Sequence, residues 1–383
     1  MTASKLTIRR VDPFIVHSGS SKNWVFVRIE TDEGVRGWGE CYTFPDRENA
    51  VVAFVEQLGR YLVGHDASAI KPFTHHAVRD FAGKRGSLDL FAAISGLELA
   101  HWDVLGRSCG QPIFKLLGGE FRTSFRVYAN GWSMTSDLWR KPIPELVDAA
   151  RDLVKRGYTA LKFDPFPGPW RAHIDRQEER SAVECVRSVR EAVGPEVDLL
   201  IECHRRLSTK GALRMASVFE QFDPYWLEEP VAVENVAALA EVRRSTRIPV
   251  VSGETLYGRG QFRDLFAQSA VDMINPDVSS CGGILELCQI AAMAETYTVA
   301  ISPHNYNSTA ISLAATLHAA AGMSNFLISE YFVDSPTRSI VGAALDVVNG
   351  CVELPDGPGL GIELDEELLS NRPYRELPLR AFG

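Results

Sequence analysis

Three glutamates recur along the chain at one interval, since Glu202, Glu228 and Glu254 are each 26 residues apart. An interval of this length fits one strand, one helix and two short loops, so each carboxylate takes the same place in a repeating βα unit. In a closed parallel barrel all strands end at one rim, where residues distant in sequence converge. The sequence therefore predicts a barrel with three carboxylates gathered at its C-terminal face.

Other features extend the same repeat in both directions. Polar residues occur at about the same position of the repeat as the three glutamates, at Lys162, Asp277, His304 and Glu330. Short β-rich runs that alternate with helical stretches occur at residues 126–128, 160–163, 199–202, 225–227, 250–252, 273–275, 300–302 and 326–329. Eight parallel strands separated by helices predict an α/β fold with a (β/α)7β TIM-like barrel.

The residues before the predicted barrel show a different pattern of apolar and polar residues. Apolar and polar residues alternate from residue 5 to about residue 40, which predicts an antiparallel meander. Helical periodicity follows over 51–62 and 88–105, with Gly106 in a C-cap role. Turn-forming residues at 352–359 predict a tail that returns to this region. The expected division is an α+β capping domain over 1–124, a barrel over 125–350 and a C-terminal segment over 351–383 that completes the capping domain.

Composition excludes several classes of protein. The net charge is −9 and the basic residues form no stripe, so nucleic acid is not an expected partner. The 7 cysteines are odd in number and lack CxxC spacing, which argues against a disulfide framework and favours the cytoplasm. No apolar run reaches the roughly 18 residues of a membrane span, and the N-terminus lacks a signal-peptide pattern. The sequence predicts a cytoplasmic protein with no membrane partner.

Six short motifs occur in order along almost the whole chain. They are Gly37-Trp38-Gly39-Glu40, Ala100-His101-Trp102-Asp103, Trp226-Leu227-Glu228-Glu229-Pro230, Gly253-Glu254, Asn275-Pro276-Asp277 and Ser302-Pro303-His304. Each motif alone is a weak signal. The ordered set resembles the enolase superfamily in its mandelate racemase-like subgroup, and within it the acid-sugar dehydratases of the galactonate dehydratase kind.

The resemblance implies a metal site and a general base. It places three acidic metal ligands at Glu202, Glu228 and Glu254, and oxygen ligands of this kind suit Mg²⁺. A cation there stabilises the enediolate that forms when the carbon beside a carboxylate loses its proton. His304 is the expected base, and Asp277 is expected to fix its tautomer through a hydrogen bond.

A second proton transfer distinguishes dehydratases from related enzymes. His204 lies two residues after Glu202, so on an extended strand both side chains point toward the substrate. The resemblance assigns to His204 the protonation of the departing 3-hydroxyl group. It also places Glu330 beside an oxygen of the enediolate and Lys162 near the substrate carboxylate.

Two positions depart from the family pattern. Glu202 stands where this kind of dehydratase commonly has Asp, so the extra methylene must be absorbed by a shift of metal or strand. The racemases have Lys-x-Lys where this chain has Lys162-Phe163-Asp164. An Asp there is a poor acceptor for so weak an acid, so a two-base proton transfer loses the partner of His304. This difference favours dehydration over racemisation.

Three further residues are expected to contact the substrate. Asp164 follows the second predicted strand, and Asn305 follows the expected base directly. His17 precedes Ser18-Gly19-Ser20-Ser21, an expected loop of the kind that closes over the substrate in family members.

The resulting hypothesis is a Mg²⁺-dependent dehydratase that converts an acid sugar, an aldonate or aldarate, into a 2-keto-3-deoxy acid. The alternatives are an epimerase, a racemase or an aldarolactone cycloisomerase acting through the same enediolate, and a barrel that binds without catalysing. The resemblance also implies a homo-oligomer, a dimer or an octamer.

Overall fold

The computed structural model describes residues 6–19, 22–81, 86–135, 140–166, 173–335 and 345–377. Its larger part is a ring of eight parallel strands in the order β10-β9-β8-β7-β6-β5-β4-β11. Their bounds are β4 Ser124–Asn130, β5 Ala160–Phe163, β6 Asp198–Glu202, β7 Trp226–Glu228, β8 Val250–Ser252, β9 Met273–Ile274, β10 Ala300–Ile301 and β11 Ser329–Phe332. A parallel bridge between Ile301 and Phe326 closes the ring beside β10.

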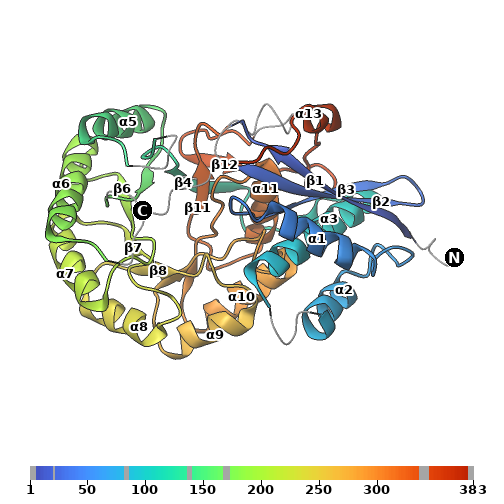
Figure 1. Ribbon diagram of the computed structural model, residues 1–383, viewed down its shortest axis with the longest axis horizontal. Coiled ribbons are helices and arrows are strands. Elements are labelled where there is room, and N and C mark those ends of the chain that lie inside the picture. The colour runs from blue at the N-terminus through green and yellow to red at the C-terminus, as the bar shows by residue number, and fades with distance from the viewer. Residues whose placement is uncertain are drawn as a thin grey trace.

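Seven helices follow the first seven strands of this ring and form a curved outer row around much of it (Figure 1). They are α5 Ile143–Lys155, α6 Arg176–Val193, α7 Thr209–Phe219, which the short turn η2 Glu220–Phe222 extends, α8 Val236–Ser245, α9 Arg259–Ala267, α10 Ile284–Thr296 and α11 Ala310–Ala321. The predicted (β/α)7β barrel is confirmed. Its last strand begins three residues later than predicted, because Phe326 pairs with Ile301 before β11 joins β4.

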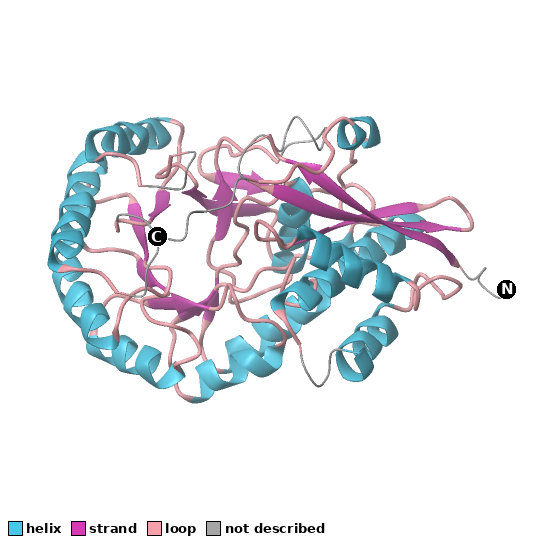
Figure 2. Cartoon of the chain, viewed as in Figure 1, coloured by secondary structure: helices cyan, strands magenta, loops and turns pink. Residues whose placement is uncertain are grey.

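The capping region lies to one side of the barrel, as the two cartoon views show (Figures 1 and 2). Its antiparallel sheet has the order β1-β2-β3 and confirms the predicted meander. The strands are β1 Ile8–His17, β2 Asn23–Thr31 and β3 Arg36–Cys41. The helices are α1 Glu48–Gly59, α2 Ile70–His76, which continues as the π-helical turn η1 Ala77–Phe81, α3 Leu88–Cys109 and α4 Ile113–Leu116. The sequence did not predict α2.

The prediction that Gly106 ends a helix was wrong. Helix α3 continues to Cys109 and ends at Gly110, whose φ of 63° is the left-handed conformation that favours glycine. Gly106 is instead a contact point within the helix. A Cβ there would lie 2.6 Å from the Cα of Gly359, so the absence of a side chain lets the C-terminal segment approach α3.

The C-terminal segment returns to the capping region, as predicted. Strand β12, Cys351–Glu353, pairs antiparallel with β4, and the short helix α13, Glu366–Ser370, follows. The backbone N–H of Leu360 donates to Asp103 Oδ1 of α3 at 2.8 Å. Glu366 of α13 forms an ion pair with Arg28 of β2 at 2.7 Å. The division of the chain at residues 124 and 350 stays a prediction.

The period of two along each strand decides what faces the barrel interior. On β6, Leu199 and Ile201 pack outward against the helices, while Leu200 joins a separate interior cluster. That cluster consists of Tyr128, Ala160, Leu200, Trp226, Val251, Met273 and Ile328. Glu202 lies two residues beyond Leu200 and therefore stands above this apolar floor, at the C-terminal rim. In the part of the chain that the structure describes, no helix is long and apolar enough to cross a membrane.

Candidate active site

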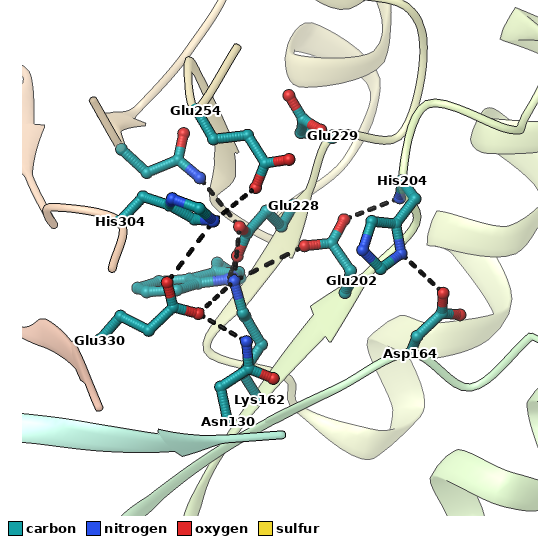
Figure 3. Close-up of polar contacts among 12 residues, drawn as sticks. Asn130, Lys162, Asp164, Glu202, His204, Glu228, Glu229, Glu254, His304 and Glu330 are labelled. Carbon is teal, nitrogen blue, oxygen red and sulfur yellow. Dashed lines mark hydrogen bonds and ion pairs between the residues drawn. The ribbon is translucent and has the colours of Figure 1, made fainter. Parts of the chain in front are cut away.

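The three glutamates spaced at 26 residues meet at the rim of the barrel. Glu202, Glu228 and Glu254 each offer a carboxylate oxygen, and these atoms all lie within 4.8 Å of one another. Glu202 and Glu228 end β6 and β7, and Glu254 lies two residues after the end of β8. Figure 3 shows the three carboxylates converging from neighbouring segments. The extra methylene of Glu202 therefore does not take its carboxylate away from the other two.

Protein donors hold Glu228 from both sides. Its Oε1 accepts hydrogen bonds from Lys162 Nζ at 2.9 Å and from Asn275 Nδ2 at 2.8 Å, and its Oε2 accepts one from Trp226 Nε1 at 3.0 Å. Lys162 Nζ also lies 2.9 Å from Glu330 Oε1. Lys162 thus lies beneath the carboxylates as a fixed positive charge. The expected contact between Lys162 and a substrate carboxylate stays a prediction.

The carboxylates carry more negative charge than the neighbouring cations balance. Burial and repulsion by Glu202 raise the pKa of Glu228 to about 8, and burial also raises the pKa of Glu202. Burial acts in the same sense on Glu254, but attraction by His304 and Arg205 lowers its pKa to about 2. Three converging oxygen donors with unbalanced charge fit a divalent cation, and hard oxygen ligands suit Mg²⁺.

His304 forms the expected pair with Asp277. Its Nδ1 lies 2.7 Å from Asp277 Oδ2, and because a carboxylate only accepts, Nδ1 carries the proton. The other ring nitrogen, Nε2, faces Glu254 at 3.3 Å and Glu330 at 3.6 Å. Burial opposes a charge on His304, but attraction by Glu330 and Glu254 raises its pKa to about 9. Positive charge among the glutamates would oppose this rise and leave Nε2 free to accept a proton.

His204 reaches the site by a different route from the one expected. The strand ends at Glu202, and His204 and Arg205 turn the chain with φ values of 45° and 61°. The prediction from strand alternation was therefore wrong about the path. The turn is closed by the His204 N–H, which donates to Glu202 Oε1 at 2.7 Å. In Figure 3 the His204 ring lies on the side of Glu202 away from His304.

Asp164 has partners within the protein that the sequence did not reveal. Its Oδ2 lies 2.7 Å from His204 Nδ1 and accepts a hydrogen bond from Arg206. Its Oδ1 accepts from the backbone N–H of Phe166 at 2.9 Å. Both carboxylate oxygens therefore have protein partners, and the expected contact with a substrate hydroxyl stays a prediction. Arg206 and Asp164 are buried, so this charged pair is shielded from solvent.

Glu330 sits on the eighth strand, facing the glutamates. Its Oε1 accepts from Asn130 Nδ2 at 2.6 Å, and its Oε2 accepts from the backbone N–H of Asn305 at 2.6 Å. Burial opposes its charge, yet Lys162 and His304 lower its pKa, so it is an ionised acceptor. To donate to an enediolate oxygen it would first have to gain a proton.

Two predicted substrate contacts line cavities in the structure. Asn305 lines a cavity of about 520 Å³ together with Tyr331 and Leu345. His17 Nδ1 lies 3.2 Å from Asn23 Oδ1, and the residue lines a second cavity, of about 350 Å³, beside the C-terminal segment. Both roles stay predictions. Ser20 and Ser21 of the loop after His17 lie outside the described residues.

Several residues at the site escaped the sequence analysis. Arg205 Nη1 lies 3.1 Å from Glu254 Oε1, and its place directly after His204 was an available signal. The ring of Tyr42 lies 5.8 Å from that of His304, and the Tyr306 ring stacks on His304 at 6.3 Å. Lys22, whose side chain is buried, lies over Tyr42 at 4.7 Å. No sequence pattern pointed to Lys22.

Two family models account for most of the chain. The model described as the mandelate racemase/muconate lactonizing enzyme N-terminal domain matches residues 4–118, and the enolase C-terminal domain-like model matches residues 145–368. The chain belongs to the enolase superfamily, in its mandelate racemase/muconate lactonizing enzyme subgroup.

Individual members of the superfamily are similar over nearly the full length. The D-gluconate/D-galactonate dehydratase of Picrophilus torridus is 32% identical over 380 residues, covering 96% of this chain and 94% of that protein. The D-galactarolactone cycloisomerase of Agrobacterium fabrum is 34% identical over 362 residues, covering 90% of each. The crystal structure of a mandelate racemase/muconate lactonizing enzyme-like protein from Rubrobacter xylanophilus has a TM-score of 0.88 and 34% identity, covering 98% of this chain and 99% of that one.

Proposed function

We propose that this enolase-superfamily protein is a Mg²⁺-dependent dehydratase of an acid sugar, which removes the C2 proton and the C3 hydroxyl to give a 2-keto-3-deoxy acid. One observation carries the proposal. Two histidines, each hydrogen-bonded through Nδ1 to an aspartate, stand on different sides of the carboxylate cluster. A dehydration needs one group to take a proton and another to give one, and this arrangement supplies both.

His304 is the proposed base. Asp277 holds the proton on Nδ1, so the lone pair of Nε2 points toward Glu254 and Glu330, where the acid end of the substrate would lie. The C2 proton moves to Nε2, and the electron pair of the C–H bond passes into the carboxylate to form the enediolate. A divalent cation held by Glu202, Glu228 and Glu254 would supply positive charge against the substrate carboxylate oxygens. Lys162 would hold the same end of the substrate, and Glu330 would join it only after gaining a proton.

His204 is the proposed acid. Its Nδ1–H donates to Asp164, and its Nε2 would deliver a proton to the C3 hydroxyl as the C–O bond breaks. The electron pair of the enediolate forms the C2–C3 double bond, water leaves, and the enol product tautomerises to the 2-keto acid. Asp164 is thus reassigned from a substrate contact to a positioning residue for His204.

A cycloisomerase is the second candidate, because a similar protein of comparable identity is a D-galactarolactone cycloisomerase. It would use the same C2 proton abstraction by His304. The two candidates differ in substrate, since a dehydratase acts on the open-chain acid and a cycloisomerase acts on the lactone. The arrangement of His204 with Asp164 favours dehydration here.

The test is an assay of aldonic acids, aldaric acids and aldarolactones with Mg²⁺ in D₂O. It follows 2-keto acid formation and C2 deuteration together. A keto product from an open-chain acid supports the proposal, while turnover of lactones alone supports the cycloisomerase. His304→Asn should abolish both signals, by about 10²- to 10⁴-fold for loss of a general base. His204→Asn should stop keto acid formation and retain C2 deuteration. If His304→Asn still exchanged the C2 proton, the base would be wrongly assigned.

A further inference from the structure

Lys22 brings a buried positive charge from the capping region to the barrel site. It lies immediately before β2, and its side chain is 4% exposed. Its Nζ lies 4.7 Å from the centre of the Tyr42 ring and 6.0 Å from that of Tyr306, and it donates one long hydrogen bond, of 3.4 Å, to the Tyr306 carbonyl oxygen. A lysine ammonium has three donors, so two of them have no acceptor among the described residues.

The nearby carboxylates do not neutralise Lys22 by direct contact. No carboxylate of the described residues lies within the 4.0 Å of an ion pair with its Nζ. Glu40 instead accepts hydrogen bonds from the backbone and hydroxyl of Thr309, and Glu48 accepts one from Asn23. Burial lowers the pKa of Lys22 to about 8 even though Glu40 and Asp277 attract its charge. The Lys22 ammonium is therefore buried with two N–H groups that have no acceptor and with no counterion among the described residues, which is energetically unfavourable.

The contacts also place Lys22 relative to the reaction. Tyr42 and Tyr306, the two rings that Lys22 faces, both pack on the ring of His304. The Nε2 of His304 lies 3.6 Å from Glu330, which is an ion-pair partner of Lys162. The contacts therefore connect the proposed base to two lysines, to Lys22 through the rings of Tyr42 and Tyr306 and to Lys162 through Glu330.

We propose that Lys22 receives a second carboxylate at the far end of the substrate, so that the enzyme prefers aldaric acids to aldonic acids. This inference rests on the proposed function for the identity of the substrate. The first carboxylate belongs with the glutamates and Lys162, where the proton beside it is lost. A carboxylate at the other end of the chain gives Lys22 both an acceptor and a counterion, whereas a terminal hydroxyl gives an acceptor alone.

The experiment compares acids that share the configuration of C2 to C5 and differ at C6. Galactarate and D-galactonate make one pair, and D-glucarate and D-gluconate make another. With Mg²⁺, the wild-type protein should turn over at least one diacid with a kcat/KM at least about tenfold higher than that of its monoacid partner. A difference of this size corresponds to one charge-assisted hydrogen bond. Lys22→Met should lower this diacid-to-monoacid ratio by at least about tenfold, and Lys22→Arg should restore most of it.

A matched variant and a binding measurement complete the design. Lys71→Met, at an exposed position of α2, should leave the ratio unchanged. A wild-type preference for monoacids, or an equal loss on both acids in Lys22→Met, would overturn the inference and leave the dehydratase intact. If wild-type protein neither dehydrates nor exchanges any acid, the proposed function fails. In that case the binding of galactarate and galactonate is measured by calorimetry in the presence of Mg²⁺. Equal affinities for the two acids would overturn the proposed role of Lys22. A preference for the diacid that is lost in Lys22→Met would support that role.

Discussion

His204 Nδ1 lies 2.7 Å from Asp164 Oδ2. The same distance separates Nδ1 of His304 from Oδ2 of Asp277. In each pair the aspartate and the histidine follow different strands, and the hydrogen bond at Nδ1 fixes the orientation of the ring. The site therefore holds two oriented imidazoles, and the partner of each can be tested separately.

Asp164→Asn should slow keto acid formation by about 10²-fold, because the amide no longer stabilises a protonated His204. C2 deuteration should persist, since His304 and Asp277 are untouched. This retained exchange also controls for folding, because the substitution leaves Arg206 buried without its carboxylate partner. Dehydration at the wild-type rate would show that Asp164 does not act on His204.

Mg²⁺ should stabilise the protein against heat, because a cation relieves the repulsion among Glu202, Glu228 and Glu254. At 100 times its Kd the ion adds about 2.7 kcal/mol to the free energy of unfolding. The measurement is the Tm of chelator-treated protein with and without Mg²⁺. Glu202→Gln should remove the shift in Tm, while Glu184→Gln, at an exposed position of α6, should keep it. An absent shift with Mg²⁺ and with Mn²⁺ would contradict a divalent site.

His101 should make the protein less stable as the pH falls from about 6.5 to about 4. Its side chain is buried, and neither ring nitrogen has a hydrogen-bond partner among the described residues. Burial lowers its pKa from 6.5 to about 4, so in this window the unfolded chain binds a proton that the folded chain excludes. Stability from this group is complete above about pH 6.5 and is lost below it, by up to about 3 kcal/mol.

The check is urea unfolding of wild-type and His101→Leu protein between pH 4 and 7. The variant should show a weaker loss of stability toward pH 4. His75→Gln, at an exposed position of α2, should follow the wild-type curve. Identical pH dependence in wild type and His101→Leu would mean that His101 titrates normally.

Gly106→Ala should destabilise the protein by about 1–3 kcal/mol, the usual cost of overpacking. The added methyl group would meet Gly359 at 2.6 Å and push the C-terminal segment away from α3. Gly260→Ala in α9 is the matched control, because nothing lies within 4 Å of its new Cβ. That control should be neutral or slightly stabilising. A denaturation midpoint for Gly106→Ala equal to that of wild type would show that Gly359 moves away from the added methyl group without loss of stability.

The sequence by itself determined the barrel and the carboxylate cluster. The interval of 26 residues reflects the length of a βα unit, which is a local property of the chain. Once the strands are parallel and closed, their ends must share one rim, so Glu202, Glu228 and Glu254 had to meet. The pairing of His304 with Asp277 followed from the same geometry, since neighbouring strands bring equivalent positions together.

Only the tertiary structure decided the contacts made by loops and between regions. The turn at His204 and Arg205, with positive φ, depends on the hydrogen bond from the His204 N–H to Glu202, and no periodicity encodes it. Asp164 joins His204, Lys22 faces Tyr306, and Gly106 meets Gly359 across long sequence separations. Such contacts depend on where whole elements pack and not on a repeating pattern along the chain. For this reason the strand ends and the pairing of His304 with Asp277 could be predicted, whereas the contacts made by Asp164, Lys22 and Gly106 could not.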